Sequence, residues 1–232
     1  MMSAPHESSE HRVRSRNLAQ HLALHVLTDR EWSRGRDILA VSSAALDGGA
    51  TAIQLRDKTA STRTLVEVGR ALRVLTREHG SLLIVNDRID VALAVDADGA
   101  HVGQDDMPAH IARQLLGPDR ILGISAGSLE EASRAVAAHA DYVSIGPIHP
   151  TRAKADAGPP TGTQLITEVA ARYSTPLMAI GGITPENVGE IIRAGAVGVA
   201  VISTVVNAED ITAAAHRLST VIQNTLTDDR GI

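Results

Sequence analysis

The sequence predicts a single (β/α)8 barrel, the α/β fold in which eight parallel strands alternate with eight helices. Short apolar runs alternate with helical patterns eight times between residues 21 and 226, as expected for a parallel sheet covered by helices. The chain has 232 residues, 44% of them hydrophobic, with no Phe, one Trp and two Tyr. Its core must therefore be aliphatic, which suits strands that are buried on both faces.

The first half of the chain supplies four of the expected strand–helix pairs. We expect strands at 21–27, 52–55, 82–85 and 100–102, and helices at 36–46, 62–79, 91–95 and 108–116. The second of these helices carries Leu65, Val68 and Leu72 close to a helical period. Pro108 opens the fourth, because proline is tolerated in the first turn of a helix.

The second half continues the pattern without a linker, a low-complexity segment or a sequence repeat. We expect strands at 121–124, 142–145, 177–180 and 198–202, and helices at 128–138, 163–172, 184–194 and 211–226. Ser128 and Glu131 form a capping box at the start of one helix. Thr184 is expected to cap another, with Pro185 in its first turn. One catalytic barrel over residues 21–226 follows.

The ends of the chain and its charge narrow the function classes. Residues 1–20 are polar and lack an apolar segment, so we expect a disordered tail and not a secretory signal, with a C-terminal tail at 227–232. The absence of cysteine fits a reducing compartment, and we expect a cytoplasmic protein. The net charge of −5 argues against nucleic-acid binding, which usually needs a basic surface. No apolar run reaches the ~18 residues of a membrane span. We expect small-molecule partners, and leave homo-oligomer formation open.

Acidic residues follow two neighbouring strands at the point where each strand ends. Asn86-Asp87 comes after the third predicted strand, and Asp105-Asp106 after the fourth. Carboxylates at adjacent strand ends suit a hard cation such as Mg²⁺, which brings water and phosphate ligands of its own. Asn and Asp also favour turns and helix caps, so each pair alone is ambiguous, but together they predict a site for phosphate chemistry.

Basic residues follow two other strands. Gln54, Arg56 and Lys58 alternate along an extended segment and so share one side of it, which suits an anionic substrate. Lys154 lies in a long basic loop after the sixth strand and could approach a diphosphate. A solvated charged loop is the alternative in both cases.

The loops after the seventh and eighth predicted strands carry Gly181-Gly182 and Ser203. Barrels of this class often bind phosphate there, on exposed backbone N–H groups. The ten histidines form no metal set; among them we expect only His149, in the loop after the sixth strand, to lie at the active face.

These segments together resemble the thiamine-phosphate synthase family over about residues 22–205. Each segment alone is a weak signal, and their joint order and spacing is specific. The segments that carry the resemblance are Leu27-Thr28-Asp29-Arg30, Gln54-Leu55-Arg56-Asp57-Lys58, Val85-Asn86-Asp87-Arg88, Ala100-His101-Val102-Gly103-Gln104-Asp105-Asp106-Met107-Pro108, Ala140-Asp141-Tyr142-Val143, Gly146-Pro147-Ile148 and Ala179-Ile180-Gly181-Gly182-Ile183.

The resemblance implies a transferase of thiamine biosynthesis. It would join 4-amino-2-methyl-5-hydroxymethylpyrimidine diphosphate to a (carboxy)thiazole phosphate and release thiamine phosphate and diphosphate. By the same resemblance Asp87 and Asp106 would hold Mg²⁺. The residues implied around the pyrimidine diphosphate are Gln54, Arg56, Lys58, Asn86, Ser125 and Lys154, and those implied around the thiazole phosphate are Thr151, Gly182, Ile202 and Ser203.

Residues that neutralise a leaving diphosphate suit a dissociative displacement, with Arg56, Lys58, Ser125 and Lys154 as the expected catalytic residues. No protein nucleophile is needed for such a reaction.

The chain departs from the family at three positions: Ala153 replaces a threonine, His149 an aromatic residue, and Gly127 a histidine. Arg152 could compensate for the first change by binding the thiazole phosphate. Two alternatives stay open. One is an isomerase like the sister thiazole tautomerase, and the other is a barrel that binds thiazole or thiamine phosphate without catalysis.

Overall fold

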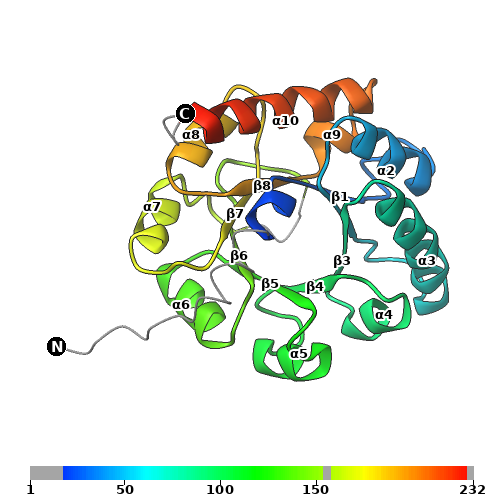
Figure 1. Ribbon diagram of the computed structural model, residues 1–232, viewed down its shortest axis with the longest axis horizontal. Coiled ribbons are helices and arrows are strands. Elements are labelled where there is room, and N and C mark those ends of the chain that lie inside the picture. Colours follow the sequence, from blue (N-terminus) through cyan, green and yellow to red (C-terminus); the bar gives the residue numbers. More distant parts are fainter. Residues whose placement is uncertain (1–17, 154–157, 229–232) are drawn as a thin grey trace.

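Eight parallel strands close into a barrel in chain order, and the eighth strand pairs with the first. The computed structural model describes residues 18–153 and 158–228. Figure 1 looks down the barrel and shows the ring of strands inside a ring of helices. The strands are β1 Leu24–Leu27, β2 Ala52–Leu55, β3 Leu82–Asn86, β4 Gly99–Val102, β5 Ile121–Ala126, β6 Tyr142–Ile145, β7 Leu177–Ile180 and β8 Gly198–Val201.

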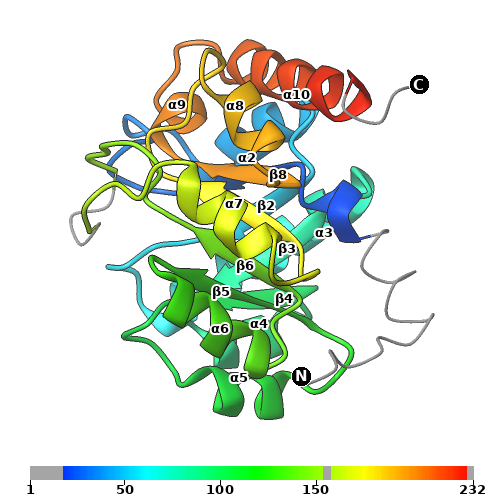
Figure 2. The ribbon, with the colours of Figure 1, turned by 90° about the vertical axis from the view of Figure 1, so that its left-hand side faces the viewer.

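A helix follows every strand, which confirms the predicted (β/α)8 barrel. Figure 2 shows the helices packed along the outside of the strands. They are α2 Ile38–Asp47, α3 Thr62–Glu78, α4 Ile89–Ala94, α5 Ala109–Leu116, α6 Leu129–Ala137, α7 Gln164–Ala170, α8 Val188–Arg193, α9 Ser203–Val206 and α10 Ile211–Asp228. Within the described residues, no helix is both long and apolar enough to cross a membrane.

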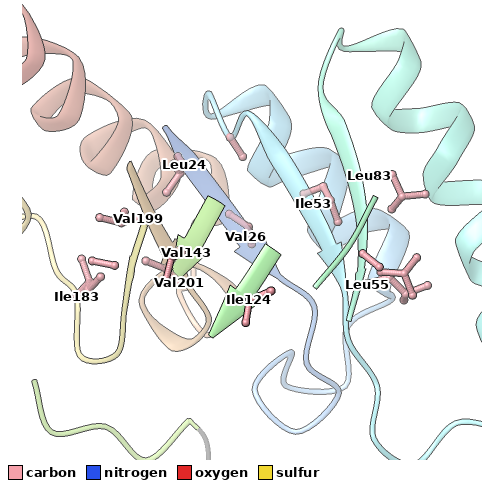
Figure 3. Packing of buried hydrophobic residues seen from close by; sticks show 14 of the residues in the cluster. Leu24, Val26, Ile53, Leu55, Leu83, Ile124, Val143, Ile183, Val199 and Val201 are labelled. Atoms are coloured by element: carbon pink, nitrogen blue, oxygen red, sulfur yellow. The ribbon is translucent and has the colours of Figure 1, made fainter. Parts of the chain in front are cut away.

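Alternate residues of each strand face opposite sides of the barrel wall. Leu24, Val26 and Ile53 belong to the large aliphatic cluster that also contains buried residues of the helices; Figure 3 shows these side chains beside those of neighbouring strands. Leu27 and Tyr142 belong to a second, smaller cluster. The wall therefore has an aliphatic outer layer and a separate inner layer.

The inner layer contains polar side chains. His25, Gln54 and His101 alternate along their strands with members of the aliphatic cluster, and all three are almost fully buried. Both nitrogens of His25 and Oε1 of Gln54 have no hydrogen-bond partner among the described residues. The barrel interior is thus partly polar even below the strand ends.

Two aspartates at the strand beginnings each join a helix to a neighbouring strand. Asp98, just before β4, accepts hydrogen bonds from Leu83 N at 2.8 Å and from Arg73 of α3 at 2.6 Å. Asp141, just before β6, accepts from Leu122 N at 2.8 Å and from Arg113 of α5. An aspartate that links a helix arginine to a strand N–H therefore occurs twice, at the end of the barrel opposite the expected active face.

The first strand begins later than predicted. Residues 18–21 form a helical segment, and Leu22 N donates to Leu18 O at 3.0 Å, so β1 starts at Leu24 and not at residue 21. Figure 2 shows this dark blue segment at the end of the barrel opposite the long loop after β6. Most of the expected N-terminal tail, residues 1–17, lies outside the described residues.

The prediction that Thr184 caps a helix is wrong. Thr184 N donates to Oδ1 of Asn187 at 2.8 Å, and Nδ2 of Asn187 donates to Gly182 O at 2.9 Å. These bonds hold a turn, so α8 begins only at Val188. The last strand and helix also shift: β8 ends at Val201, the short helix α9 follows, and α10 continues to Asp228, into the expected C-terminal tail.

Candidate active site

A cavity of about 620 Å³ opens at the carboxyl ends of the strands, the face that carries the active site in barrels of this class. Its lining comes from residues of β3 to β8 and from the segments that follow β2 to β8. Ten of the thirteen predicted site residues line it: Arg56, Lys58, Asn86, Asp87, Asp106, Ser125, Thr151, Gly182, Ile202 and Ser203.

Asp87 and Asp106 reach the cavity from neighbouring strands, since β3 pairs with β4 through Asn86 and His101. Asp87 has a positive φ of 62° and its N–H donates to His101 O at 2.8 Å, which turns the chain sharply after β3. Asp106 accepts from Gly103 N at 2.7 Å. Neither α4 nor α5 has a side-chain cap, so the capping alternative does not describe these carboxylates.

The donors around the cavity suit a hard divalent cation. Among the described residues, four carboxylates line it, from Asp87, Asp105, Asp106 and Glu131, together with the cationic side chains of Arg56 and Lys58. Within the part of the chain that the structure describes, no three His, Asp or Glu side chains form a group that could hold a metal ion. Mg²⁺ is commonly bound through one or two carboxylates together with substrate phosphate, and Asp87 and Asp106 offer two such carboxylates.

Arg56 reaches the cavity with its guanidinium anchored. Its Nη1 donates to Oδ2 of Asp29 in a pair whose two side chains are each 9% exposed. Thr28 fixes the backbone on the same side, since its hydroxyl accepts from Arg56 N at 2.8 Å. Asp29 itself accepts from Glu31 N at 3.0 Å. A held guanidinium can present its remaining N–H groups to an anion.

Ser125 lines the cavity at the end of β5, beside a histidine that the sequence did not single out. Oγ of Ser125 lies 2.9 Å from Nε2 of His101, and His101 is 5% exposed. His101 occupies an inward position of β4 and lines the cavity floor. Period-two alternation within the strand could have identified it.

The loops after β7 and β8 form the opposite wall. Gly182 has a φ of +65°, and a Cβ there would lie 2.7 Å from Cβ of His149 and 2.8 Å from Pro150 O. Glycine is therefore required both by conformation and by space. Ser203 begins α9, an unpredicted short helix. Thr151 faces them, with its hydroxyl accepting from Ala153 N at 3.1 Å.

Three predicted residues are not part of the described lining. Gln54 is buried and Arg152 is exposed, and neither is among the lining residues, while Lys154 lies outside the described residues. His149 is not the only histidine at this face, because His101 lines the cavity. His149 lies in the loop after β6 beside Gly182, outside the lining and 3.5 Å from Glu190.

Fold and cavity together define a (β/α)8-barrel enzyme. The family model described as thiamine monophosphate synthase matches residues 24–205, and the chain belongs to this family. It is 52% identical to a thiamine-phosphate synthase of Roseiflexus sp. over 89% of this chain and 87% of that protein. For the thiamine-phosphate synthase of Moorella thermoacetica the identity is 51%, over 86% and 95%.

A solved structure is similar to this chain in both fold and sequence. The thiamine phosphate pyrophosphorylase of Pyrococcus furiosus superposes with a TM-score of 0.83 at 42% identity, over 90% of this chain and all of that one. The similarity therefore covers the barrel and the segments that line its cavity.

Proposed function

We propose that this chain is a thiamine-phosphate synthase that joins a pyrimidine diphosphate to a thiazole phosphate. One observation carries the proposal. In a chain half identical to named synthases, anion-binding and acidic residues from opposite sides of the barrel converge on one cavity. Two substrates that each bear phosphate need two such regions on the two sides of a reacting centre.

The pyrimidine diphosphate would lie near β2 to β5. Arg56, held by Asp29, would donate to its diphosphate, and Lys58 at the rim would add a second positive charge. Asn86 and Ser125 would contact the substrate from the adjacent strand ends. Lys154 is expected from the resemblance to join them.

The thiazole phosphate would lie on the opposite wall. There the backbone around Gly182 and the hydroxyls of Thr151 and Ser203 would donate to its phosphate oxygens, as loops after the last two strands do in many barrels. Ile202 would pack against the thiazole ring.

The reaction would be a dissociative displacement. The bond between the pyrimidine methylene and the diphosphate oxygen breaks, and its electron pair leaves with the diphosphate. The lone pair of the thiazole nitrogen then forms the new carbon–nitrogen bond. Arg56 and Lys58 would stabilise the negative charge that develops on the leaving oxygen, which is the main catalytic task of such a site. No side chain has to act as a nucleophile.

Asp87 and Asp106 would hold Mg²⁺. The bound ion would neutralise part of the diphosphate charge and make it a better leaving group. The carboxylates would also fix where the diphosphate lies relative to Arg56, because they belong to rigid strand ends on one side of the barrel.

A product assay tests the proposal. The protein is mixed with both substrates and Mg²⁺, and thiamine phosphate and diphosphate are measured by chromatography. Equal amounts of both products are expected, with little product when EDTA removes the metal. Thiazole isomerisation without condensation would support the tautomerase alternative, and binding without turnover the non-catalytic barrel; either result would contradict the proposal.

A further inference from the structure

A buried chain of three side chains leads from the centre of the barrel to the cavity. Tyr142 is 1% exposed, and its hydroxyl lies 3.0 Å from Nδ1 of His101. Nε2 of His101 in turn lies 2.9 Å from Oγ of Ser125. The chain ends at the cavity, since His101 and Ser125 line it and Tyr142 does not.

The barrel is shaped around this chain. The rings of His101 and Tyr142 are stacked, with centroids 5.6 Å apart and an interplanar angle of 23°. A Cβ on Gly123 would lie 2.3 Å from the Tyr142 hydroxyl and 2.5 Å from Nδ1 of His101. Glycine at this position of β5 therefore leaves the space in which the two side chains meet.

The protonated hydroxyl of Tyr142 determines which atom donates in the Tyr142–His101 and His101–Ser125 hydrogen bonds. Burial raises the pKa of Tyr142 above its ordinary value of 10, so the hydroxyl keeps its proton. Within the described part of the chain that hydroxyl has one hydrogen-bond partner, Nδ1 of His101. A buried O–H needs an acceptor, and a neutral imidazole has one acceptor and one donor nitrogen. Nδ1 then accepts and Nε2 donates to Ser125.

We propose that Tyr142 is a positioning residue that orients the Ser125 hydroxyl through His101. Since Oγ of Ser125 accepts from Nε2, its own proton points elsewhere, towards the cavity. Ser125 thereby becomes a hydrogen-bond donor aimed at an acceptor atom of the pyrimidine diphosphate. The ligand in this inference rests on the proposed function, whereas the tautomer of His101 does not.

A double-mutant cycle tests the coupling. Tyr142→Phe keeps both ring contacts and removes the hydroxyl, and Ser125→Ala removes the group on which it acts. We expect Tyr142→Phe to lower kcat about tenfold in the wild-type background, and less than about twofold in the Ser125→Ala background. Equal losses in both backgrounds would overturn the inference, because a merely structural effect does not depend on Ser125.

Tyr173→Phe is the matched control. Tyr173 is the other tyrosine, its ring packs at the edge of the core, and no hydrogen bond of its hydroxyl is found among the described residues. Its kcat is expected to equal that of the wild type. Thermal unfolding of each variant separates loss of positioning from loss of fold.

The tautomer gives a readout that is independent of turnover. Long-range ¹H–¹⁵N spectra of the full chain, with the His101 signals assigned through His101→Gln, should show Nδ1 unprotonated and Nε2 protonated in the wild type. Tyr142→Phe should shift the signals towards a mixture of tautomers. A protonated Nδ1 in the wild type would overturn the inference. If the wild type made no thiamine phosphate, the proposed function would fail while this spectrum still decided the inference.

Discussion

Arg56 is the residue that best shows how the site holds charge in a fixed place. Its guanidinium is buried against Asp29 at the end of β1, and its backbone is tied to Thr28. A long cationic side chain usually loses conformational freedom when it binds an anion. In this fold the Arg56 side chain is already restricted by Asp29. The affinity for diphosphate should therefore depend on the Asp29 carboxylate, although that carboxylate does not contact the ligand.

Asp29→Asn tests this dependence. Asparagine keeps the shape and can still accept from Glu31 N, but it loses the charge that holds the guanidinium. The KM for the pyrimidine diphosphate should rise about tenfold, and stability should fall by roughly 3 kcal/mol because a buried pair is broken. Steady-state kinetics and urea unfolding measure the two effects.

Asp90→Asn is the matched control, because Asp90 pairs with Arg88 at the surface and outside the cavity. Asp90→Asn should change neither the KM for the pyrimidine diphosphate nor the free energy of unfolding measurably. An Asp29→Asn enzyme with unchanged KM would show that Arg56 does not need the pair.

Single residues were predictable where they follow a strand. Asp87, Asp106 and Ser203 lie at or shortly after strand ends, and the rule that barrel sites lie at the carboxyl ends of strands places them on one face. His101 was missed because it lies inside a strand, between Ala100 and Val102, where a histidine resembles a core residue. Arg152 lies outside the described lining, and its predicted role rests on the resemblance, because loop sequence does not tell which way a side chain points.

Asp98 and Asp141 stabilise the beginnings of the strands, because each accepts hydrogen bonds from a helix arginine and from the backbone of a neighbouring strand. Asp141 joins Leu122 N of β5 to Arg113 of α5, and Arg113 also donates to Gly117 O, Arg120 O and His139 O. One carboxylate thus orders a guanidinium that ties together the segment after α5 and the loop before β6.

Asp141→Ala should destabilise the protein by about 1–3 kcal/mol, because it leaves Leu122 N–H without its side-chain acceptor and the partly buried Arg113 without its carboxylate partner. The substitution lies at the end opposite the cavity, so KM for both substrates should stay at wild-type values. Urea unfolding checks the first effect and kinetics the second.

Glu130→Ala provides the comparison. It removes the exposed i,i+4 pair between Glu130 and Arg134 and should cost no more than about 0.5 kcal/mol. Equal losses in the two variants would mean that Asp141 acts as an ordinary surface charge.

Element types were predicted better than element ends. The eight strands are short apolar runs between turn residues, and each was found within about three residues of its predicted start. The start of α8 was wrong because Asn187 bonds back to Thr184 and Gly182, a contact that composition does not reveal. The four residues of α9 include Val205 and Val206, whose β-branched side chains do not favour a helix.

At the scale of the whole molecule, the barrel encloses an ionisable group at its centre. His25 is fully buried and edge-on to Tyr142, with ring centroids 5.8 Å apart. Burial lowers the pKa of His25 from 6.5 to about 3. The folded state therefore keeps this imidazole neutral, while the unfolded chain binds a proton below pH 6.5.

Between pH 6.5 and about 3, the unfolded chain gains a proton that the folded state does not, so stability falls as the pH falls. The slope from this group is at most about 1.4 kcal/mol per pH unit. His25→Phe should remove that component of the acid slope when unfolding free energies are measured by urea titration at several pH values.

His79→Gln is the contrasting variant. A hydrogen bond to Leu75 O, and then the nearby Asp47, raise the pKa of His79. The contribution of His79 to the stability of the fold is therefore present below pH 6.5 and is lost as the pH rises. His79→Gln should leave the acid slope intact. An unchanged acid slope in His25→Phe would contradict a neutral buried His25.

If Asp87 and Asp106 hold Mg²⁺ beside the diphosphate, both carboxylates are needed for turnover. The initial rate of thiamine phosphate formation is measured against Mg²⁺ concentration for the wild type, Asp87→Ala and Asp106→Ala. Asp90→Ala serves as the control, since Asp90 pairs with Arg88 at the surface and lies outside the cavity lining. Asp87→Ala and Asp106→Ala should lose on the order of a hundredfold in rate and the control should lose little, whereas near-wild-type Mg²⁺-dependent rates in both variants would show that these carboxylates do not hold a catalytic Mg²⁺.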